Sequence, residues 1–149
     1  MKNKLVYGAY MSNAFAEAPA PKAPLYLKVD KAYKNWWFKK TSEELNGDFY
    51  VKVQHAIQGH PDLPRLWQLF IDNILTKIGF KPTTHEPCVY SLPQEVFGEE
   101  VFLLHQVDDF AIGCDRPETA EKICTLIDQQ MSAPLKREGL IHRFNGIDV

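Results

Sequence analysis

The stretch VFLLHQVDDFAIGC, residues 101–114, holds two apolar runs on either side of a pair of aspartates. Short apolar runs that flank a polar tip are typical of a β-hairpin, and they predict Asp108 and Asp109 at its turn. A hairpin turn favours Asn-Gly or Asp-Gly and needs no second carboxylate. Adjacent carboxylates also repel each other, and buried strands beside them raise that cost. The pair is therefore either a solvated acidic turn or a site for hard divalent cations, which take oxygen ligands.

Amphipathic helices are predicted on both sides of this hairpin. Over residues 63–78, apolar side chains recur with a 3.6-residue period, with Pro64 in the first turn and Gly79 just past the end. A second helix spans about 116–131, and Asp115 with the glutamate three residues later resembles a capping box. The apolar stripes of both helices predict a core rather than cofactor sites.

The remaining regular elements are expected to be short strands and one short helix. A Pro/Ala connector at 16–24 cannot be regular helix, and Asp30 can cap a helix that follows it. The expected strands cover 5–11, 25–29, 49–57, 88–92 and 143–149, the last broken by Gly146. The principal elements then run strand, helix, strand, strand, helix, strand. This order predicts an α+β fold of the ferredoxin-like split βαβ type, a sheet with helices on one face.

Composition sets limits on the class of protein. A chain of 149 residues with 45% hydrophobic and 24% charged residues allows one globular domain of ordinary size, or part of a larger one, and excludes a disordered chain. Its 3 Cys give no even disulfide framework, which favours a reducing, intracellular compartment. No run of eighteen apolar residues predicts a membrane span. The apolar run after Lys2 and Lys4 is too short for a secretory signal, so we expect no secretion.

Charge is divided unevenly along the chain. Residues 1–40 hold eight Lys against Glu17 and Asp30, a net charge of +6, although the whole chain carries −2. The other 109 residues hold nine basic and seventeen acidic groups, a net charge of −8. The first segment is either a solvated lysine-rich face or a surface for an anionic partner such as nucleic acid.

Five blocks of the sequence resemble copia-type retrotransposon reverse transcriptases. The aspartate pair lies in HQVDDFAIG, which is similar to that family's aspartate-pair motif, with Gln106 where the family usually has Tyr. The other similar blocks, all in family order, are SNAFAEAPAPKAPLYLKVD (12–30), AIQGHPDLPRLWQ (56–68), GFKPTTHEPCVYS (79–91) and LKREGLIHRFNGIDV (135–149). The resemblance thus covers nearly the whole chain, from residue 12 to residue 149.

The resemblance implies a fold, a reaction and roles for particular residues. It implies the palm of a polymerase right hand with partial fingers and no thumb, so that 1–149 is a partial reverse transcriptase domain. The implied activity is RNA- and DNA-templated DNA synthesis from deoxynucleoside triphosphates with two Mg²⁺ ions, in a cytoplasmic particle or the nucleus. Asp108 and Asp109 would be catalytic metal ligands. Phe15 would stack under the sugar, and Gln58 and Gly59 would lie against the incoming nucleotide and the template.

The chain departs from the family pattern at the first catalytic aspartate. Tyr10 stands at that position, and a neutral phenol is a poor ligand for Mg²⁺. The resemblance implies that strand 5–11 pairs beside the hairpin, with Tyr10 within one side-chain length of Asp108 or Asp109. We therefore expect a truncated copy without useful polymerase activity.

Other interpretations of the chain remain open. In one, residues 1–11 come from a mispredicted exon and the true gene carries the aspartate. The competing classes are a non-enzymatic remnant that binds nucleic acid through its lysine-rich segment and an unrelated ferredoxin-like binding module.

Overall fold

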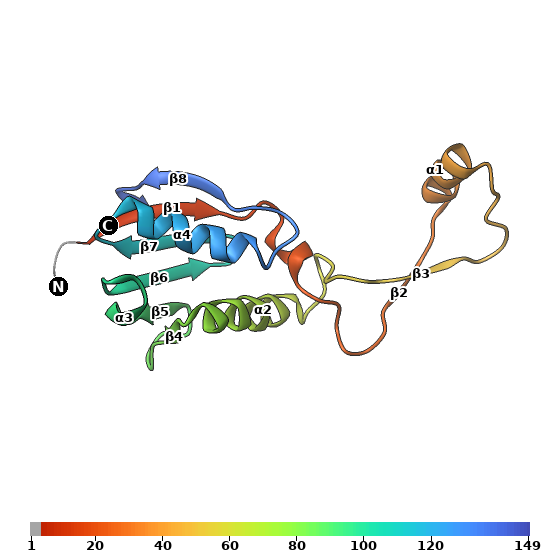
Figure 1. Ribbon diagram of the computed structural model, residues 1–149. Helices are drawn as coiled ribbons and strands as arrows, with labels where there is room; N and C mark the ends of the chain where they lie inside the picture. The colour runs from red at the N-terminus through yellow and green to blue at the C-terminus, as the bar shows by residue number, and fades with distance from the viewer. Residues whose placement is uncertain (1–3) are drawn as a thin grey trace.

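The computed structural model describes residues 4–149 and has an α+β fold with a six-stranded antiparallel sheet (Figure 1). In chain order, the strands are β1 (Leu5–Tyr10), β2 (Tyr26–Lys28), β3 (Tyr50–Lys52), β4 (Lys81–Pro82), β5 (Val89–Leu92), β6 (Val101–Gln106), β7 (Asp109–Cys114), β8 (Lys136–Leu140), β9 (Arg143–Phe144) and β10 (Ile147–Asp148). The helices are the 3₁₀ helix η1 (Ala14–Glu17) and the α-helices α1 (Lys31–Thr41), α2 (Leu63–Ile78), α3 (Gln94–Phe97) and α4 (Pro117–Asp128). Lys2, part of the signal-like and lysine-rich segments, lies outside the described residues.

The sheet has the strand order β4-β5-β6-β7-β1-β8. Because β7 runs antiparallel to both β1 and β6, those two strands are parallel with β7 between them. Helix α2 lies in the crossover from β1 to β6, and α4 lies in the crossover from β7 to β8. The expected order of strands and helices is therefore present, and β5 and β4 extend the sheet beyond β6.

One hydrophobic core lies between the sheet and the two long helices, which cross the same face of the sheet (Figure 1). The prediction of α2 at 63–78 is confirmed at both ends. The buried side chains include Trp67, Ile71, Ile74 and Leu75 from α2, Ile123 and Ile127 from α4, and Leu103, Phe110 and Ile112 from the sheet. Full burial of each aliphatic side chain contributes roughly 1.5–3 kcal/mol, so this layer carries most of the hydrophobic stabilisation.

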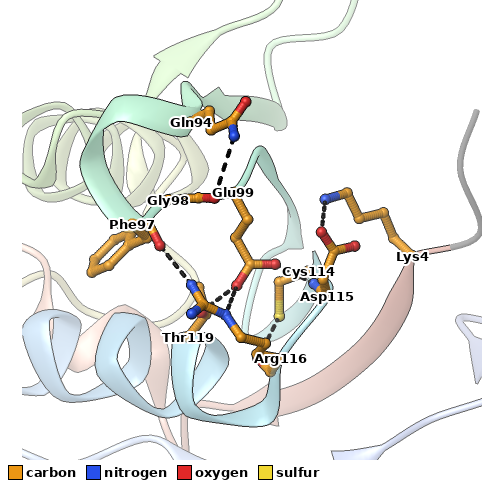
Figure 2. Close-up of polar contacts among 9 residues, drawn as sticks. All are labelled: Lys4, Gln94, Phe97, Gly98, Glu99, Cys114, Asp115, Arg116 and Thr119. Carbon is orange, nitrogen blue, oxygen red and sulfur yellow. Dashed lines mark hydrogen bonds and ion pairs between the residues drawn. The ribbon is translucent and has the colours of Figure 1, made fainter.

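The predicted capping box at the start of α4 is wrong. The cap residue is Arg116, which makes no side-chain cap hydrogen bond. Instead, the buried carboxylate of Glu99, just before β6, accepts hydrogen bonds from the Asp115 N–H, the Thr119 hydroxyl and the Arg116 Nε at 3.0 Å (Figure 2). Burial opposes ionisation of Glu99, but these hydrogen bonds and the Arg116 charge outweigh it and lower the pKa of Glu99. A distant carboxylate thus replaces the local cap.

The chain after β8 also differs from the prediction of a single strand over 143–149. Strands β9 and β10 form a small hairpin around Asn145 and Gly146, whose φ angles are 49° and 83°. Positive φ at both central residues is the type I′ geometry that Asn-Gly favours. The last strand of the main sheet is instead β8, which pairs with β1.

Residues 20–54 project from the sheet as an arm that consists of the β2–β3 ribbon and α1 (Figure 1). The predicted cap of α1 is confirmed, since Asp30 Oδ1 accepts a hydrogen bond from the Tyr33 N–H at 2.8 Å. Both ribbon strands are shorter than expected, and α1 buries no residue. At the base of the arm, Pro19 bridges His55 and the Ala56 N–H donates to the Ala18 carbonyl at 3.0 Å. The arm therefore leaves and re-enters the sheet module at one point.

Candidate active site

The β6–β7 hairpin has a two-residue turn whose central residues are Val107 and Asp108. Gln106 and Asp109 close the turn as a direct pair, so Asp109 belongs to β7 rather than to the tip that the sequence predicted. The φ of Val107 is 54°, and Asp108 is not among the residues with positive φ. A positive φ at only the first central residue is the type II′ pattern, in which glycine is usual. A β-branched residue with positive φ is strained.

Two contacts from other elements hold this strained turn in place. The Trp67 Nε1 of α2 donates a hydrogen bond to the Val107 carbonyl at 2.7 Å. The N–H of Met11, directly after β1, donates to the Asp108 carbonyl at 2.8 Å. Strain of this kind persists where the surroundings over-determine the backbone, and such positions cluster at functional sites. The turn therefore holds Val107, the residue directly before Asp108, in a conformation that its side chain does not favour.

Replacing Val107 with glycine should stabilise the fold by about 1 kcal/mol. The strained conformation costs about 1–3 kcal/mol and the added chain freedom of glycine about 0.5–1 kcal/mol, while the Val107 side chain is 41% exposed and loses little packing. Urea unfolding measures the change. The matched control is Val96→Gly, because Val96 is 46% exposed in helix α3 and has no positive φ. Val96→Gly should destabilise the fold. A Val107→Gly chain that unfolds at as low a urea concentration as this control would show that Val107 is not strained.

Four side chains form a row across the sheet at the turn end. Gln106 of β6 pairs with Asp109 of β7, Asp109 pairs with Tyr10 of β1, and Tyr10 pairs with Lys136 of β8. The prediction that Tyr10 lies beside the aspartate pair is confirmed. Side chains alternate along strands, and the neighbouring Ala9 belongs to the core, so this row lies on the face away from α2 and α4. The row is the candidate active site.

The electrostatics of the row are mixed. Asp109 is half-buried, and burial together with the negative charge of Asp108 raises the pKa of Asp109. On the other side, the Lys136 Nζ lies 5.2 Å from the centre of the Tyr10 ring. A cation in this position is attracted to the face of the ring. The row thus places one ammonium next to the position where the family resemblance expects a third carboxylate.

The donor set does not fit the two-metal site that the resemblance implies. Two metal ions carry four positive charges and need several anionic oxygens. The turn and the row together offer only the carboxylates of Asp108 and Asp109, with a neutral phenol and an ammonium beside them. Among residues 4–149, no three His, Cys, Asp or Glu side chains are grouped so that they could hold a metal ion. The two carboxylates fit, at most, a single weakly held divalent cation.

The structure places the other predicted site residues on neighbouring segments. Phe15 lies in η1, four residues after Met11, and is partly buried against the core. Gln58 and Gly59 are exposed in the turn before α2, where the φ of Gly59 is 93°. The hydrogen bond at the base of the arm joins the segments that carry Phe15 and Gln58. The structure pairs Tyr10 directly with Asp109.

Three residues of the site were not predicted. The sequence pattern assigns Val107 to an apolar run, whereas the structure places it in the two-residue turn. The apolar stripe predicts that Trp67 is a core residue. A buried indole N–H also needs a hydrogen-bond acceptor, and in the structure this acceptor is the Val107 carbonyl. Lys136 lies in a segment, LKREGL, with no clear alternation, and nothing local marked it as a strand.

No family model, curated protein or solved structure matches this chain. Within residues 4–149, the structure contains no helix that is both long and apolar enough to span a membrane.

Proposed function

We propose that this chain is a reverse transcriptase domain of the copia type by descent, and that its polymerase activity is impaired by Tyr10. The observation that carries the proposal is the pairing of Tyr10 with Asp109, next to the turn that holds Asp108. The family's first catalytic aspartate belongs at position 10, and a site built on that alignment needs position 10 beside the aspartate pair. A phenol in that place removes one anionic ligand and leaves the backbone framework intact.

The topology supports the same proposal. The strand order β8-β1-β7-β6, with α2 and α4 in the two crossovers, is the ferredoxin-like split βαβ arrangement expected of a polymerase palm. The projecting arm corresponds to part of the fingers. By family, the partners would be an RNA or DNA template-primer and a deoxynucleoside triphosphate with Mg²⁺, in an intracellular particle or the nucleus. Phe15, Gln58 and Gly59 keep their proposed roles at the sugar and the incoming nucleotide.

Binding of Mn²⁺ to the chain tests the lost ligand directly. Tyr10→Asp should tighten Mn²⁺ binding by about tenfold or more, because affinity for hard cations rises with the number of anionic oxygen ligands. Electron paramagnetic resonance of free Mn²⁺ measures the affinity. Tyr10→Asn is the matched control and should leave it weak, and adding Asp109→Asn to Tyr10→Asp should reverse the gain. Equal affinities for Tyr10→Asp and Tyr10→Asn would refute the metal-site proposal.

A second candidate function is non-enzymatic binding of single-stranded nucleic acid by the arm. In the β2–β3 ribbon, Tyr26 pairs with Lys52 and Lys28 pairs with Tyr50. Because residues two apart share a face, these four side chains form a checkerboard of two rings and two ammonium groups. The rings of Tyr26 and Tyr50 are 55% and 54% exposed. Exposed rings can stack on bases, and lysines can contact phosphates.

Charge reversal tests this second function. Replacing Lys28, Lys31 and Lys34 with Glu should abolish binding of a fluorescent oligothymidylate, and binding to the unaltered chain should weaken steeply with salt. The matched control reverses three exposed lysines outside the arm, Lys77, Lys81 and Lys122, and therefore changes net charge equally. Fluorescence anisotropy measures both. Equal loss in the two triple variants would indicate a net-charge effect, and unchanged binding in the arm variant would place the contact elsewhere.

A further inference from the structure

A buried histidine with no hydrogen-bond partner lies in β6, two residues before the strained turn. The His105 residue is 1% exposed, and neither ring nitrogen has a partner among the described residues. A buried polar group without a partner is costly, and native structures retain few of them. Its ring lies between two other aromatic rings, with centroids 5.8 Å from Tyr90 and 6.0 Å from Phe110. Leucine or phenylalanine would fill this apolar site without burying unpaired nitrogen atoms.

The groups around His105 stabilise its charged form very little. From α2, the carboxylate of Asp72 is the charged group that favours protonation, and it already accepts a hydrogen bond from the Tyr90 hydroxyl at 3.2 Å. From β5, the phenol of Tyr90 stays neutral, because burial and Asp72 raise its pKa. Before β5, burial and then Glu86 raise the pKa of Cys88, so that its thiol is also uncharged. From β7, the neighbour is the apolar Phe110.

We propose that His105 makes the β6–β7 hairpin an acid-sensitive element, which is closed when the ring is neutral and opens locally when the ring takes up a proton. A protonated ring carries two N–H donors, and the closed core offers neither of them an acceptor. Opening exposes the ring to water and frees the Val107 carbonyl from Trp67. This device does not depend on the proposed reverse transcriptase ancestry, because it rests on the core and the turn alone.

The pH range of the device follows from burial. Burial lowers the pKa of His105 from 6.5 to about 4 in the closed state, with Asp72 partly opposing the shift. A group whose folded pKa is lowered binds more protons in the open state, so the closed state loses stability as pH falls from 6.5 towards 4. The equilibrium constant for opening then rises about 30-fold between pH 7.5 and pH 5. Glu99, whose folded pKa lies below 4.5, acts mainly at lower pH.

Hydrogen exchange with peptide resolution tests the proposal on the full chain. After correction for the intrinsic exchange rate, protection of the amides in 101–114 should fall about 30-fold between pH 7.5 and pH 5. Protection of α4 should change much less, because it lies outside the opening segment. In His105→Leu, protection of 101–114 should be independent of pH over this range. His105→Phe serves as a second variant that keeps an aromatic ring between Tyr90 and Phe110.

Control variants separate this device from general acid effects. His85 is exposed in the loop before β5, and His85→Leu should leave the pH dependence unchanged. Asp72→Asn should leave the onset of the loss near pH 6.5 and extend the loss to lower pH, because it removes the charge that favours the protonated ring in the closed state. The proposal is overturned if both His105 variants keep the pH dependence of the unaltered chain. It is also overturned if α4 loses protection by the same factor, since the opening would then be global.

Discussion

Aspartate in place of Tyr10 should raise Mg²⁺-dependent primer extension by at least about 100-fold, in a chain that carries fingers and a thumb grafted from an intact relative. The reason is electrostatic, because two metal ions carry four positive charges, the triphosphate balances only part of them, and the phenol supplies no anionic oxygen. Tyr10 pairs directly with Asp109, so a carboxylate there lies next to the existing pair. Gel-based extension of a labelled primer measures the rate, and the graft with Tyr10 should stay at background.

The matched control for this rescue is Tyr10→Asn in the same graft. Asparagine has the shape of aspartate without its charge, so it should not restore extension. Lys136 sharpens the comparison, because its ammonium lies 5.2 Å from the Tyr10 ring and would partly neutralise a carboxylate placed there. Tyr10→Asp with Lys136→Gln should therefore extend primers at least as fast as Tyr10→Asp alone. Similar rates for the graft that keeps Tyr10 and the graft with Tyr10→Asp would show that position 10 is not the lost ligand.

Removal of the Glu99 carboxylate should cause a larger loss of stability than the other substitutions considered above. Glu99→Ala leaves the Asp115 N–H and the buried Thr119 hydroxyl without their acceptor, and it unpairs Arg116. The expected cost is about 3 kcal/mol, which corresponds to a fall of roughly 10 °C in Tm for a chain of this size. Thermal and urea unfolding measure it. The control Asp148→Asn breaks an exposed pair with Arg143 at 4.0 Å and should change stability little.

The same carboxylate makes stability depend on pH. The pKa of Glu99 is lowered from its ordinary value of 4.5 in the folded chain. Its contribution is therefore complete above about pH 5 and is lost as pH falls through the folded pKa. Glu99→Gln, which cannot ionise, should flatten this part of the stability profile. An unfolding profile below pH 5 with the same slope in Glu99→Gln and the unaltered chain would exclude Glu99 as the source.

Sequence patterns predicted the elements whose stability comes from their own periodicity. The period of apolar residues in 63–78 gave α2 with both ends, and the apolar runs of 101–114 gave the β6–β7 hairpin. These signals are strong because each side chain's burial depends on local geometry, which repeats along the chain. The place of strand β1 beside the aspartates followed from the resemblance, and the register confirmed that Tyr10 lies opposite Asp109.

What the sequence did not predict depends on contacts between distant segments. The Thr119 hydroxyl bonds to Glu99, twenty residues earlier, and no local rule links the two. Strand β8 is exposed along its whole length, so its residues do not alternate, and its pairing with β1 is set by backbone hydrogen bonds. The sequence pattern places His105 in an apolar run, and only the packing around it shows that its nitrogens have no partner among residues 4–149.

The junction between the arm and the sheet determines where such a chain can gain or lose a segment during evolution. Ala18 and Ala56 are held together by a backbone hydrogen bond, and every strand of the six-stranded sheet lies outside the segment between them. A short turn from residue 18 to residue 56 would leave every strand pairing of the six-stranded sheet in place. Because the cost of closing a loop grows only slowly with its length, this junction works as an insertion point. The arm can be lengthened, lost or exchanged as one unit, while the six-stranded sheet, α2 and α4 keep their shared core.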